Sequence, residues 1–227
     1  MDLRSIVDTS GLKRQRYERL TRLVQLRPTD TILELGCGAR DRSIAAWNRE
    51  NPIVGVDVLP PRRVQIDQPN FAYLQGDATD LSMVPDLSFD VVLSVGLLEH
   101  ITPDDRLRQA IREARRVARR YAFVVPHRWA FIEPHYQMPL FALWPPRLQR
   151  AWARRHPRRS PVIWPTAAAW ASLFDDPTLR ILDHWYGPLL LYRILVGGMA
   201  PDSTTRERPG PAETDPGRGE EGGRSDG

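Results

Sequence analysis

The chain has 227 residues, of which 41% are hydrophobic and 26% charged, with a formal net charge of +4 and a pI of about 9.6. The length supports one substantial core but excludes two large domains, and the composition is that of a soluble globular protein rather than a disordered or fibrous one. Lys13 is the only lysine. We attribute this arginine bias, with the 21 prolines, to a GC-rich genome rather than to a nucleic-acid-binding surface.

No stretch of the sequence has the pattern of an export signal or a transmembrane helix. The N-terminal residues carry basic side chains throughout and no long apolar run, so a secretory signal is not expected. The longest late apolar run, Gly187–Met199, is interrupted by Arg193 and falls short of the roughly 20 apolar residues that span a bilayer. The single cysteine, Cys37, cannot form an internal disulfide. We therefore predict a cytoplasmic location.

The first predicted element is a helix in an N-terminal segment, residues 1–29, where Leu20, Leu23 and Val24 form an apolar stripe. Five short apolar runs follow, alternating with helical or turn-rich stretches, as is typical of strands buried on both faces. The runs are Thr31–Gly36, Ile53–Val58, Phe71–Asp77, Phe89–Val95 and Tyr121–Pro126. Between the fourth and fifth runs, the apolar residues from Leu107 to Ala118 follow helical spacing, with arginines on the opposite face.

The sequence changes character after Pro126. Residues 127–165 are dense in proline and aromatic residues, and we interpret them as an insertion. One helix and two apolar strand-like runs come next: Thr166–Phe174, Leu179–Tyr186 and Leu189–Val196. The two runs meet at Gly187-Pro188 and are expected to close the sheet as an antiparallel pair, so residues 166–199 complete the same domain.

Strands alternating with helices predict an α/β fold. The expected architecture is a doubly wound, Rossmann-like sheet of five parallel strands plus a C-terminal antiparallel pair, with helices on both faces. Residues 30–126 are its core. Residues 200–227 are rich in Pro, Gly, Glu and Arg and lack large apolar side chains, so they are expected to be disordered.

Three of the predicted strands end in residues suited to a nucleotide-like ligand, which binds doubly wound sheets at the carboxyl ends of their strands. A glycine turn with Glu34, Gly36 and Gly38 follows the first strand and is expected to open a helix. Glycine allows positive φ and close approach of a ligand to the backbone. Asp57 ends the second strand, at a spacing from the turn where an acid accepts hydrogen bonds from ribose hydroxyls. The third strand ends at Gly76-Asp77-Ala78.

A dinucleotide site would need a third glycine at the position of Asp41, where an acid would face two phosphates, so that class is disfavoured. The chain instead resembles the class I S-adenosylmethionine (SAM)-dependent methyltransferases. The similar motifs are, in chain order, ILELGCG, VGVD, GDATDL and SFDVVLSVGLLEHI. They span roughly Asp30 to Pro126 and agree in order and spacing, so the resemblance identifies residues 30–126 as a SAM-binding core.

The resemblance also implies roles for individual residues. Glu34, Gly36 and Gly38 would line the methionine moiety of SAM, and Asp57 would hold its ribose hydroxyls. The remaining implied contacts are those of Asp77 and the backbone of Ala78 with the adenine amino group, and of Ser94 and Gly96 beneath the sulfonium.

Two residues of the glycine turn depart from the simplest pattern. Many members of the resembled family carry a third glycine where this chain has Arg40. An arginine beside a helix N-terminus is suited to pair with the carboxylate of SAM, and the alternative is an Arg40 that points into solvent. Cys37 is interpreted as a small buried residue without a chemical role.

Three histidines are placed to act on a methyl acceptor, because histidine is the usual general base near neutral pH. His100 follows the fourth strand, His127 follows the fifth, and His135 lies in the insertion near Glu133. Glu-His at the position of His100 is common in the resembled family across different acceptors, so a structural or capping role is the alternative there. We select His100, His135 and Glu133 as candidate catalytic residues.

The insertion, residues 127–165, is interpreted as an acceptor lid. Its aromatic residues either wall an apolar pocket or cap the sheet: Trp129, Phe131, Tyr136, Phe141, Trp144 and Trp152. The segment PHRWAFIEPHYQMPLFALWPP resembles a lid of methyltransferases linked to glycan or lipid-like precursors. Arginines from Arg147 to Arg159 lie beside the tryptophans. A solvated basic helix is the default interpretation, and peripheral membrane contact stays open.

The sequence therefore predicts a methyltransferase with the cofactor S-adenosyl-L-methionine and a small-molecule acceptor, such as a glycan, lipid-linked or secondary-metabolite precursor. Nucleic acid is disfavoured, because Ser94-Val95-Gly96-Leu97 stands where base-amine methyltransferases of the resembled superfamily carry Asn/Asp-Pro-Pro-Tyr/Phe. An RNA methyltransferase and a degenerate SAM-binding scaffold or regulator stay open as alternatives. No metal is predicted, because no residues with recognisable ligand spacing are found. The oligomeric state is not set by the sequence.

Overall fold

The computed structural model describes residues 9–40, 43–156, 162–186 and 189–198. The predicted turn at Gly187-Pro188 and the predicted disordered tail, residues 200–227, lie outside the described residues. No helix of the described ranges is long and apolar enough to cross a membrane.

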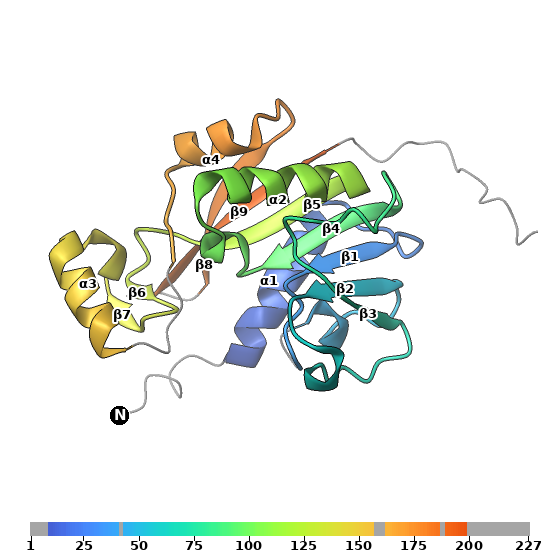
Figure 1. Cartoon of the computed structure of the whole chain (residues 1–227), viewed down its shortest axis with the longest axis horizontal. Helices are drawn as coiled ribbons and strands as arrows, with labels where there is room; N and C mark the ends of the chain where they lie inside the picture. Colours follow the sequence, from blue (N-terminus) through green and yellow to red (C-terminus); the bar gives the residue numbers. More distant parts are fainter. Residues whose placement is uncertain (1–8, 41–42, 157–161, 187–188, 199–227) are drawn as a thin grey trace, which may run out of the picture.

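A seven-stranded sheet runs through the molecule in the order β3-β2-β1-β4-β5-β9-β8 (Figure 1). Its strands are β1 (Ile32–Leu35), β2 (Ile53–Asp57), β3 (Phe71–Gln75), β4 (Phe89–Val95), β5 (Ala118–Pro126), β8 (Arg180–Tyr186) and β9 (Leu190–Gly198). Strands β1 to β5 are parallel, and β9 is antiparallel to both β5 and β8. The predicted doubly wound α/β sheet with a closing antiparallel pair is confirmed.

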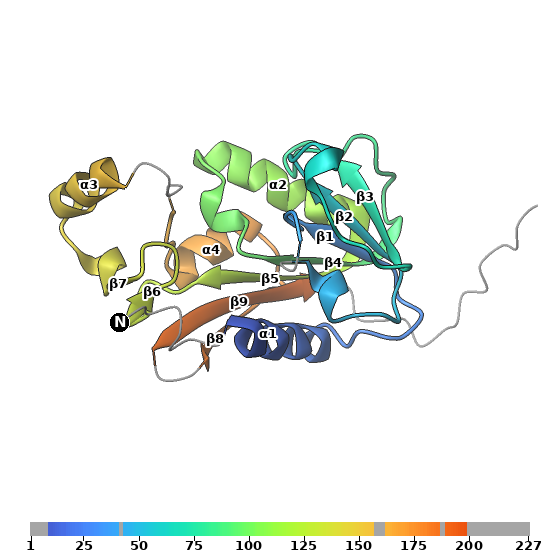
Figure 2. The ribbon, with the colours of Figure 1, turned by 90° about the horizontal axis from the view of Figure 1, so that it is seen from below.

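Helices cover both faces of this sheet (Figure 2). The helix α1 (Thr9–Leu23) lies on one face, and α2 (Asp104–Val117) and α4 (Ala167–Phe174) lie on the other. The strands alternate accordingly: Val92 of β4 belongs to the apolar core beneath α2 and α4, whereas its neighbours Val91 and Leu93 belong to the core beneath α1. Side chains on both faces of a central strand are therefore buried, which explains the continuous apolar runs in the sequence.

The predicted helix after the glycine turn is wrong for the described residues. The chain there forms only a 3-10 turn, η1 (Ile44–Ala46), with Ser43 as its N-cap. Asn48 accepts the backbone N–H groups of Glu50 and Asn51, which ends the helical turn before it can lengthen. A second short 3-10 turn, η2 (Pro61–Arg63), follows β2. These loops leave the carboxyl ends of β1 and β2 without a long covering helix among the described residues.

The insertion forms a separate layer at one end of the molecule, on the side where the arrow of β4 points (Figure 1). It contains a hairpin of β6 (Ile132–Glu133) and β7 (Met138–Pro139), the 3-10 turn η4 (Phe141–Leu143) and the helix α3 (Pro146–Arg155). The backbone N–H of Ile163 donates to the carbonyl of Glu99, which attaches the returning chain to the end of β4.

The aromatic residues of the insertion pack mainly against one another. Tyr136, Phe141, Trp144, Trp152 and Trp164 form a small cluster with ring centroids 4.2 to 6.2 Å apart. Trp129 and Phe131, by contrast, are about half exposed. The aromatic cluster is therefore the insertion's own core, which neither of the two predicted arrangements described.

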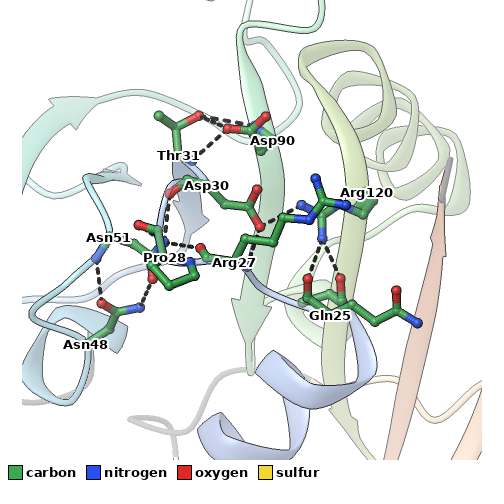
Figure 3. Close-up of polar contacts among 10 residues, drawn as sticks. Gln25, Arg27, Pro28, Asp30, Thr31, Asn48, Asn51, Asp90 and Arg120 are labelled. Carbon is green, nitrogen blue, oxygen red and sulfur yellow. Dashed lines mark hydrogen bonds and ion pairs between the residues drawn. The ribbon is translucent and has the colours of Figure 1, made fainter. Parts of the chain in front are cut away.

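A polar network ties together the amino ends of the central strands (Figure 3). The guanidinium of Arg120 on β5 pairs with Asp30 at 2.7 Å and donates to the carbonyls of Val24 and Gln25. The side-chain amide of Asn51 donates to three backbone carbonyls of residues 27–30. Both side chains are buried, and each has its polar groups satisfied by the protein.

Candidate cofactor and acceptor site

A cleft of about 210 Å³ opens at the carboxyl ends of the parallel strands, opposite the network of Figure 3. It brings together five of the sequence-predicted site residues: Gly36, Asp57, Asp77, Ala78 and His100. The other lining residues include Leu97, Thr79 and Arg106, which sequence reasoning missed. Doubly wound sheets bind nucleotide-like ligands at this edge.

The glycine turn after β1 has the backbone conformation that its glycines predict. Gly36 and Gly38 have φ values of +73° and +71°. A Cβ atom on Gly36 would lie 3.1 Å from the Cβ of Leu97, so a larger residue would be both strained and crowded. The floor of the cleft therefore depends on glycine at this position.

Asp57 joins the loops that follow β1 and β2. One carboxylate oxygen accepts the backbone N–H of Gly38 at 2.9 Å, and the other accepts that of Leu59 at 3.1 Å. The side chain thus lies at the mouth of the cleft in a fixed orientation. A carboxylate so held has further lone pairs that can accept hydrogen bonds from ligand hydroxyls.

Asp77, after the neighbouring strand β3, also lines the cleft. Its carboxylate accepts two hydrogen bonds from Thr79 and pairs with the guanidinium of Arg106 at 2.7 Å. Burial alone would raise the pKa of Asp77, but these hydrogen bonds and the charge of Arg106 hold it below its usual value. Asp77 is therefore a carboxylate at neutral pH. No signal distinguished Arg106 from the other arginines of its helix in the sequence.

Glu34 is 3% exposed and faces its own loop. Its carboxylate accepts the Ser43 hydroxyl at 2.6 Å and the backbone N–H of Ile44 at 2.9 Å. Burial raises its pKa to about 7. The contacts found for Glu34 thus fix the loop after the glycine turn, and its predicted contact with the methionine moiety stays a prediction.

The neighbouring Cys37 is fully buried, and burial with the nearby carboxylates of Glu34 and Asp57 raises its pKa to about 12. The thiol is therefore unreactive at neutral pH. This agrees with the interpretation of Cys37 as a buried residue without a chemical role.

The other predicted cofactor residues lie around the cleft rather than in its lining. The buried Ser94 donates its hydroxyl to the carbonyl of Leu35, which joins β4 to β1. Gly96 has a φ of +80°, and a Cβ there would lie 3.5 Å from a carboxylate oxygen of Glu99. Arg40 is exposed, so its side chain is open to either predicted role.

The predicted catalytic residues converge next to this cleft. His135 and Glu133, from the insertion, meet Glu99 and His100 at the end of β4. The rings of His100 and His135 are 4.8 Å apart and nearly perpendicular. His135 Nδ1 lies 2.9 Å from Glu133 Oε1, and His135 Nε2 lies 3.5 Å from Glu99 Oε1. Because His100 also lines the cleft, the cluster adjoins the cofactor site.

Glu99 is the member of this cluster that the sequence reasoning passed over. Its side chain is 1% exposed, and neither carboxylate oxygen has a hydrogen-bond partner among the described residues. Burial raises its pKa to about 7, although the nearby His135 acts in the opposite direction. Its place in the sequence, directly before His100, was the signal that could have drawn attention to it.

His127 lies apart from this cluster. Its ring is buried between the strands that close the sheet, with Nε2 2.7 Å from the guanidinium of Arg193 and 3.2 Å from the carboxylate of Asp183. Burial lowers the pKa of His127. These contacts fit a structural imidazole, and they separate His127 from the two other histidines considered in the sequence.

Comparisons with known proteins agree with this geometry. The family model described as "Methyltransferase domain" matches residues 33–125, and no curated protein matches the chain. One similar solved structure, a methyltransferase of an antibiotic biosynthesis pathway from Anabaena variabilis, is 20% identical with a TM-score of 0.55. The match covers 76% of this chain and 64% of that one, so this chain spans less than two thirds of that protein's length.

Two further structures have the same fold. A SAM-dependent methyltransferase from Thermotoga maritima is 16% identical, with a TM-score of 0.53 and coverage of 82% of this chain and 90% of that one. The N-terminal domain of EvdMO1, crystallised in the presence of SAH and D-fucose, is 16% identical, with a TM-score of 0.52 and 82% coverage of both chains. At these identities the structures show the fold alone.

The fold and the glycine turn first define a doubly wound domain of the kind that binds nucleotide-like ligands at the carboxyl edge of its sheet. The family match then narrows the class: residues 33–125 match the family model of a methyltransferase domain. This match covers the same part of the chain as the sequence motifs that resemble SAM-dependent methyltransferases.

Proposed function

We propose that the chain binds S-adenosyl-L-methionine in the cleft and transfers its methyl group to a small-molecule acceptor. The observation that carries the proposal is the placement of Asp57, Asp77 and Gly36 in the lining of one cleft. A family match over the same residues supports it. Asp57 would accept the ribose hydroxyls, and Asp77 with the backbone of Ala78 would face the adenine.

The remaining predicted contacts fit around this placement. Gly38 and Gly96 have positive φ, and Ser94 donates to the carbonyl of Leu35. The methionine part of SAM would lie beside the glycine turn near Glu34, with Ser94 and Gly96 beneath the sulfonium. Arg40 is exposed beside the glycine turn, where a guanidinium can pair with the carboxylate of SAM.

Methyl transfer is a displacement at carbon. A lone pair of the acceptor attacks the methyl carbon, the carbon–sulfur bond breaks, and its electron pair stays on sulfur, so the sulfonium becomes the thioether S-adenosylhomocysteine (SAH). An acceptor hydroxyl gives its proton in the same process to a general base, for which His100, His135 and Glu133 are the candidates, or to water. The protein contributes mainly by holding the two partners in line.

The cluster of Glu99, His100, Glu133 and His135 is proposed to contact the polar group of the acceptor. It adjoins the cleft and combines buried carboxylates with imidazoles. The insertion also exposes apolar side chains: Trp129, Phe131, Leu140 and Leu148 are each more than a third exposed. An acceptor with a polar end and an apolar or glycan-bearing body fits this combination.

Calorimetric titration of the full chain with SAM and SAH tests the cofactor. We expect micromolar binding that Asp57→Ala weakens by about 10- to 100-fold, since a hydrogen bond to a charged group contributes about 1.5–3 kcal/mol. Asp57→Asn, which keeps an acceptor oxygen, should weaken binding less. Asp67→Ala, a matched change at an exposed aspartate outside the cleft, should have no effect.

A folded wild-type chain that binds neither compound would overturn the proposal. Tight binding without SAH formation across a broad acceptor panel would favour the degenerate SAM-binding scaffold. Salt-dependent RNA binding with methylation of the RNA would favour the nucleic-acid alternative.

A further inference from the structure

The acceptor-side cluster contains three side chains whose donor atoms are close enough to share one ion. Glu99, His100 and His135 each offer one ligand atom, and these atoms all lie within 4.8 Å of one another. The closest measured pair, Glu99 Oε1 and His135 Nε2, is 3.5 Å apart. Two donors bound to one metal at about 2.1 Å lie roughly 3–3.5 Å apart, so small side-chain movements suffice.

The orientation of His135 is set from behind by Glu133. Glu133 is 1% exposed, and its Oε2 accepts the backbone N–H of Tyr136 at 2.6 Å while its Oε1 lies 2.9 Å from His135 Nδ1. A carboxylate in this position accepts a hydrogen bond, so Nδ1 carries the proton. A carboxylate that orients an imidazole in this way is the usual outer shell of a metal-ligating histidine.

His135 directs its other ring nitrogen to Glu99. With Nδ1 on Glu133, Nε2 lies 3.5 Å from the Glu99 carboxylate, a separation too long for a good hydrogen bond. Both oxygens of the buried Glu99 lack hydrogen-bond partners among the described residues. Buried carboxylates are normally paired or bound to a metal. A cation bound by Glu99 at this position would supply the missing partner.

We infer that Glu99, His100 and His135 bind one divalent transition-metal ion of the Zn²⁺ or Mn²⁺ type, with Glu133 holding His135 in its coordinating orientation. Two imidazoles and one carboxylate suit such ions better than Mg²⁺ or Ca²⁺, which prefer oxygen ligands. Three protein ligands leave coordination positions open for another molecule.

The open positions adjoin the SAM cleft through His100. The next step alone rests on the proposed function. If that function holds, oxygen atoms of the acceptor would coordinate the ion. A bound cation orients such an oxygen and lowers the pKa of its hydroxyl group. The substrate class is then an acceptor with two neighbouring oxygens that chelate a metal, such as a vicinal diol or a hydroxy-carbonyl compound.

The sequence predicted no metal because its ligand spacing is not local. Glu99 and His100 are adjacent, but His135 joins them only through the fold of the insertion. No short-range pattern marks such a set.

Direct metal binding tests the inference without any methyl-transfer assay. The full chain, free of a histidine tag and treated with a chelator, is titrated with Zn²⁺ by calorimetry, and Co²⁺ is added separately for its absorption spectrum. We expect one Zn²⁺ per chain, a visible Co²⁺ spectrum that Zn²⁺ abolishes, and a rise in melting temperature with Zn²⁺.

Four variants locate the site. Glu99→Gln and His135→Ala should each weaken Zn²⁺ binding by more than 100-fold, and Glu133→Gln should weaken it by about 10- to 100-fold, as changes behind a ligand do. The control His156→Ala removes an exposed histidine at the end of α3 and should leave the affinity unchanged. The SAH affinity of each variant, measured in parallel, reports whether the cofactor half is folded.

A wild-type chain that binds no Zn²⁺ or Co²⁺ would overturn the inference, as would equal affinity in wild type, Glu99→Gln and His135→Ala. Because Zn²⁺ and SAH are titrated separately, a metal site without a SAH site and a SAH site without a metal site give different results. Failure of the inference and failure of the proposed function are thus distinguishable.

Discussion

Two buried polar groups at opposite edges of the sheet, the Arg120–Asp30 pair and Glu99, differ in how far the surrounding protein satisfies them. At the amino edge, Arg120 and Asp30 pair directly, and Asn51 meets three carbonyls (Figure 3). At the carboxyl edge, Glu99 is equally buried but has no hydrogen-bond partner among the residues that the structure describes, and burial raises the pKa of Glu34. Satisfied networks stabilise a fold, whereas an unsatisfied buried group calls for a ligand or a chemical role.

This difference separates a structural edge from a functional one more clearly than cavity size does. An open groove of about 500 Å³ lies at the amino edge, beside α1, and is larger than the cleft at the carboxyl edge. Its buried amides, Asn48 and Asn51, are already engaged by the backbone and by each other. The smaller cleft is lined by the carboxylates of Asp57 and Asp77 and by Gly36 of the glycine turn.

The largest expected effect comes from breaking the amino-edge pair. Arg120→Met leaves the buried Asp30 without its ion-pair partner and removes the hydrogen bonds to the carbonyls of Val24 and Gln25. We expect the free energy of unfolding to fall by about 3–5 kcal/mol, measured by urea denaturation. The double variant Asp30→Asn/Arg120→Met should recover part of this loss. A loss below about 1 kcal/mol in Arg120→Met would show that the network is not structural.

Glu34 is expected to make a smaller, pH-dependent contribution to the free energy of unfolding. Its pKa is raised to about 7 in the folded chain from 4.5, so the folded state binds the proton more tightly than the unfolded state. Its contribution is therefore present below pH 4.5 and is lost as the pH rises towards 7, by up to about 3 kcal/mol.

Glu34→Gln should remove this part of the pH dependence, as followed by the unfolding free energy of both chains between pH 5 and 8. The matched change Glu18→Gln, at an exposed helical glutamate, should leave the wild-type profile intact. Parallel profiles for wild type and Glu34→Gln would contradict the perturbed pKa of Glu34.

The smallest change in the free energy of unfolding is expected for Glu99, whose carboxylate accepts no hydrogen bond from the described residues. In the chelator-treated chain at pH 8, Glu99→Gln removes a buried charge and loses no hydrogen bond among the described residues. Its free energy of unfolding should equal that of the wild type or exceed it by up to about 2 kcal/mol. A destabilisation comparable with that of Arg120→Met would make Glu99 a structural residue like those of the amino edge.

The strands and their parallel arrangement could be predicted because burial on both faces imposes continuous apolar runs, and α2 because its arginines lie opposite an apolar stripe. The 3-10 turn that replaces the expected helix after the glycine turn could not be predicted, because it depends on side-chain hydrogen bonds of Glu34, Ser43 and Asn48 to the backbone. Helix propensity and hydrophobic periodicity do not indicate such contacts.

The candidate site divides in the same way. Asp57 and Asp77 stand at strand ends, so topology alone brings them to one edge. The meeting of His135 with Glu99 depends on how the insertion returns to the end of β4, where Ile163 donates to the carbonyl of Glu99. Tertiary contacts of this kind are not encoded in local spacing.

The central claim is that the cofactor cleft and the Glu99–His100–His135 cluster form one site. A crystal structure of the full chain with SAH tests it most directly. The account predicts SAH in the cleft, with its ribose hydroxyls on Asp57, its adenine near Asp77 and its sulfur facing the cluster. SAH bound elsewhere, or bound with its sulfur directed away from the cluster, would contradict the account.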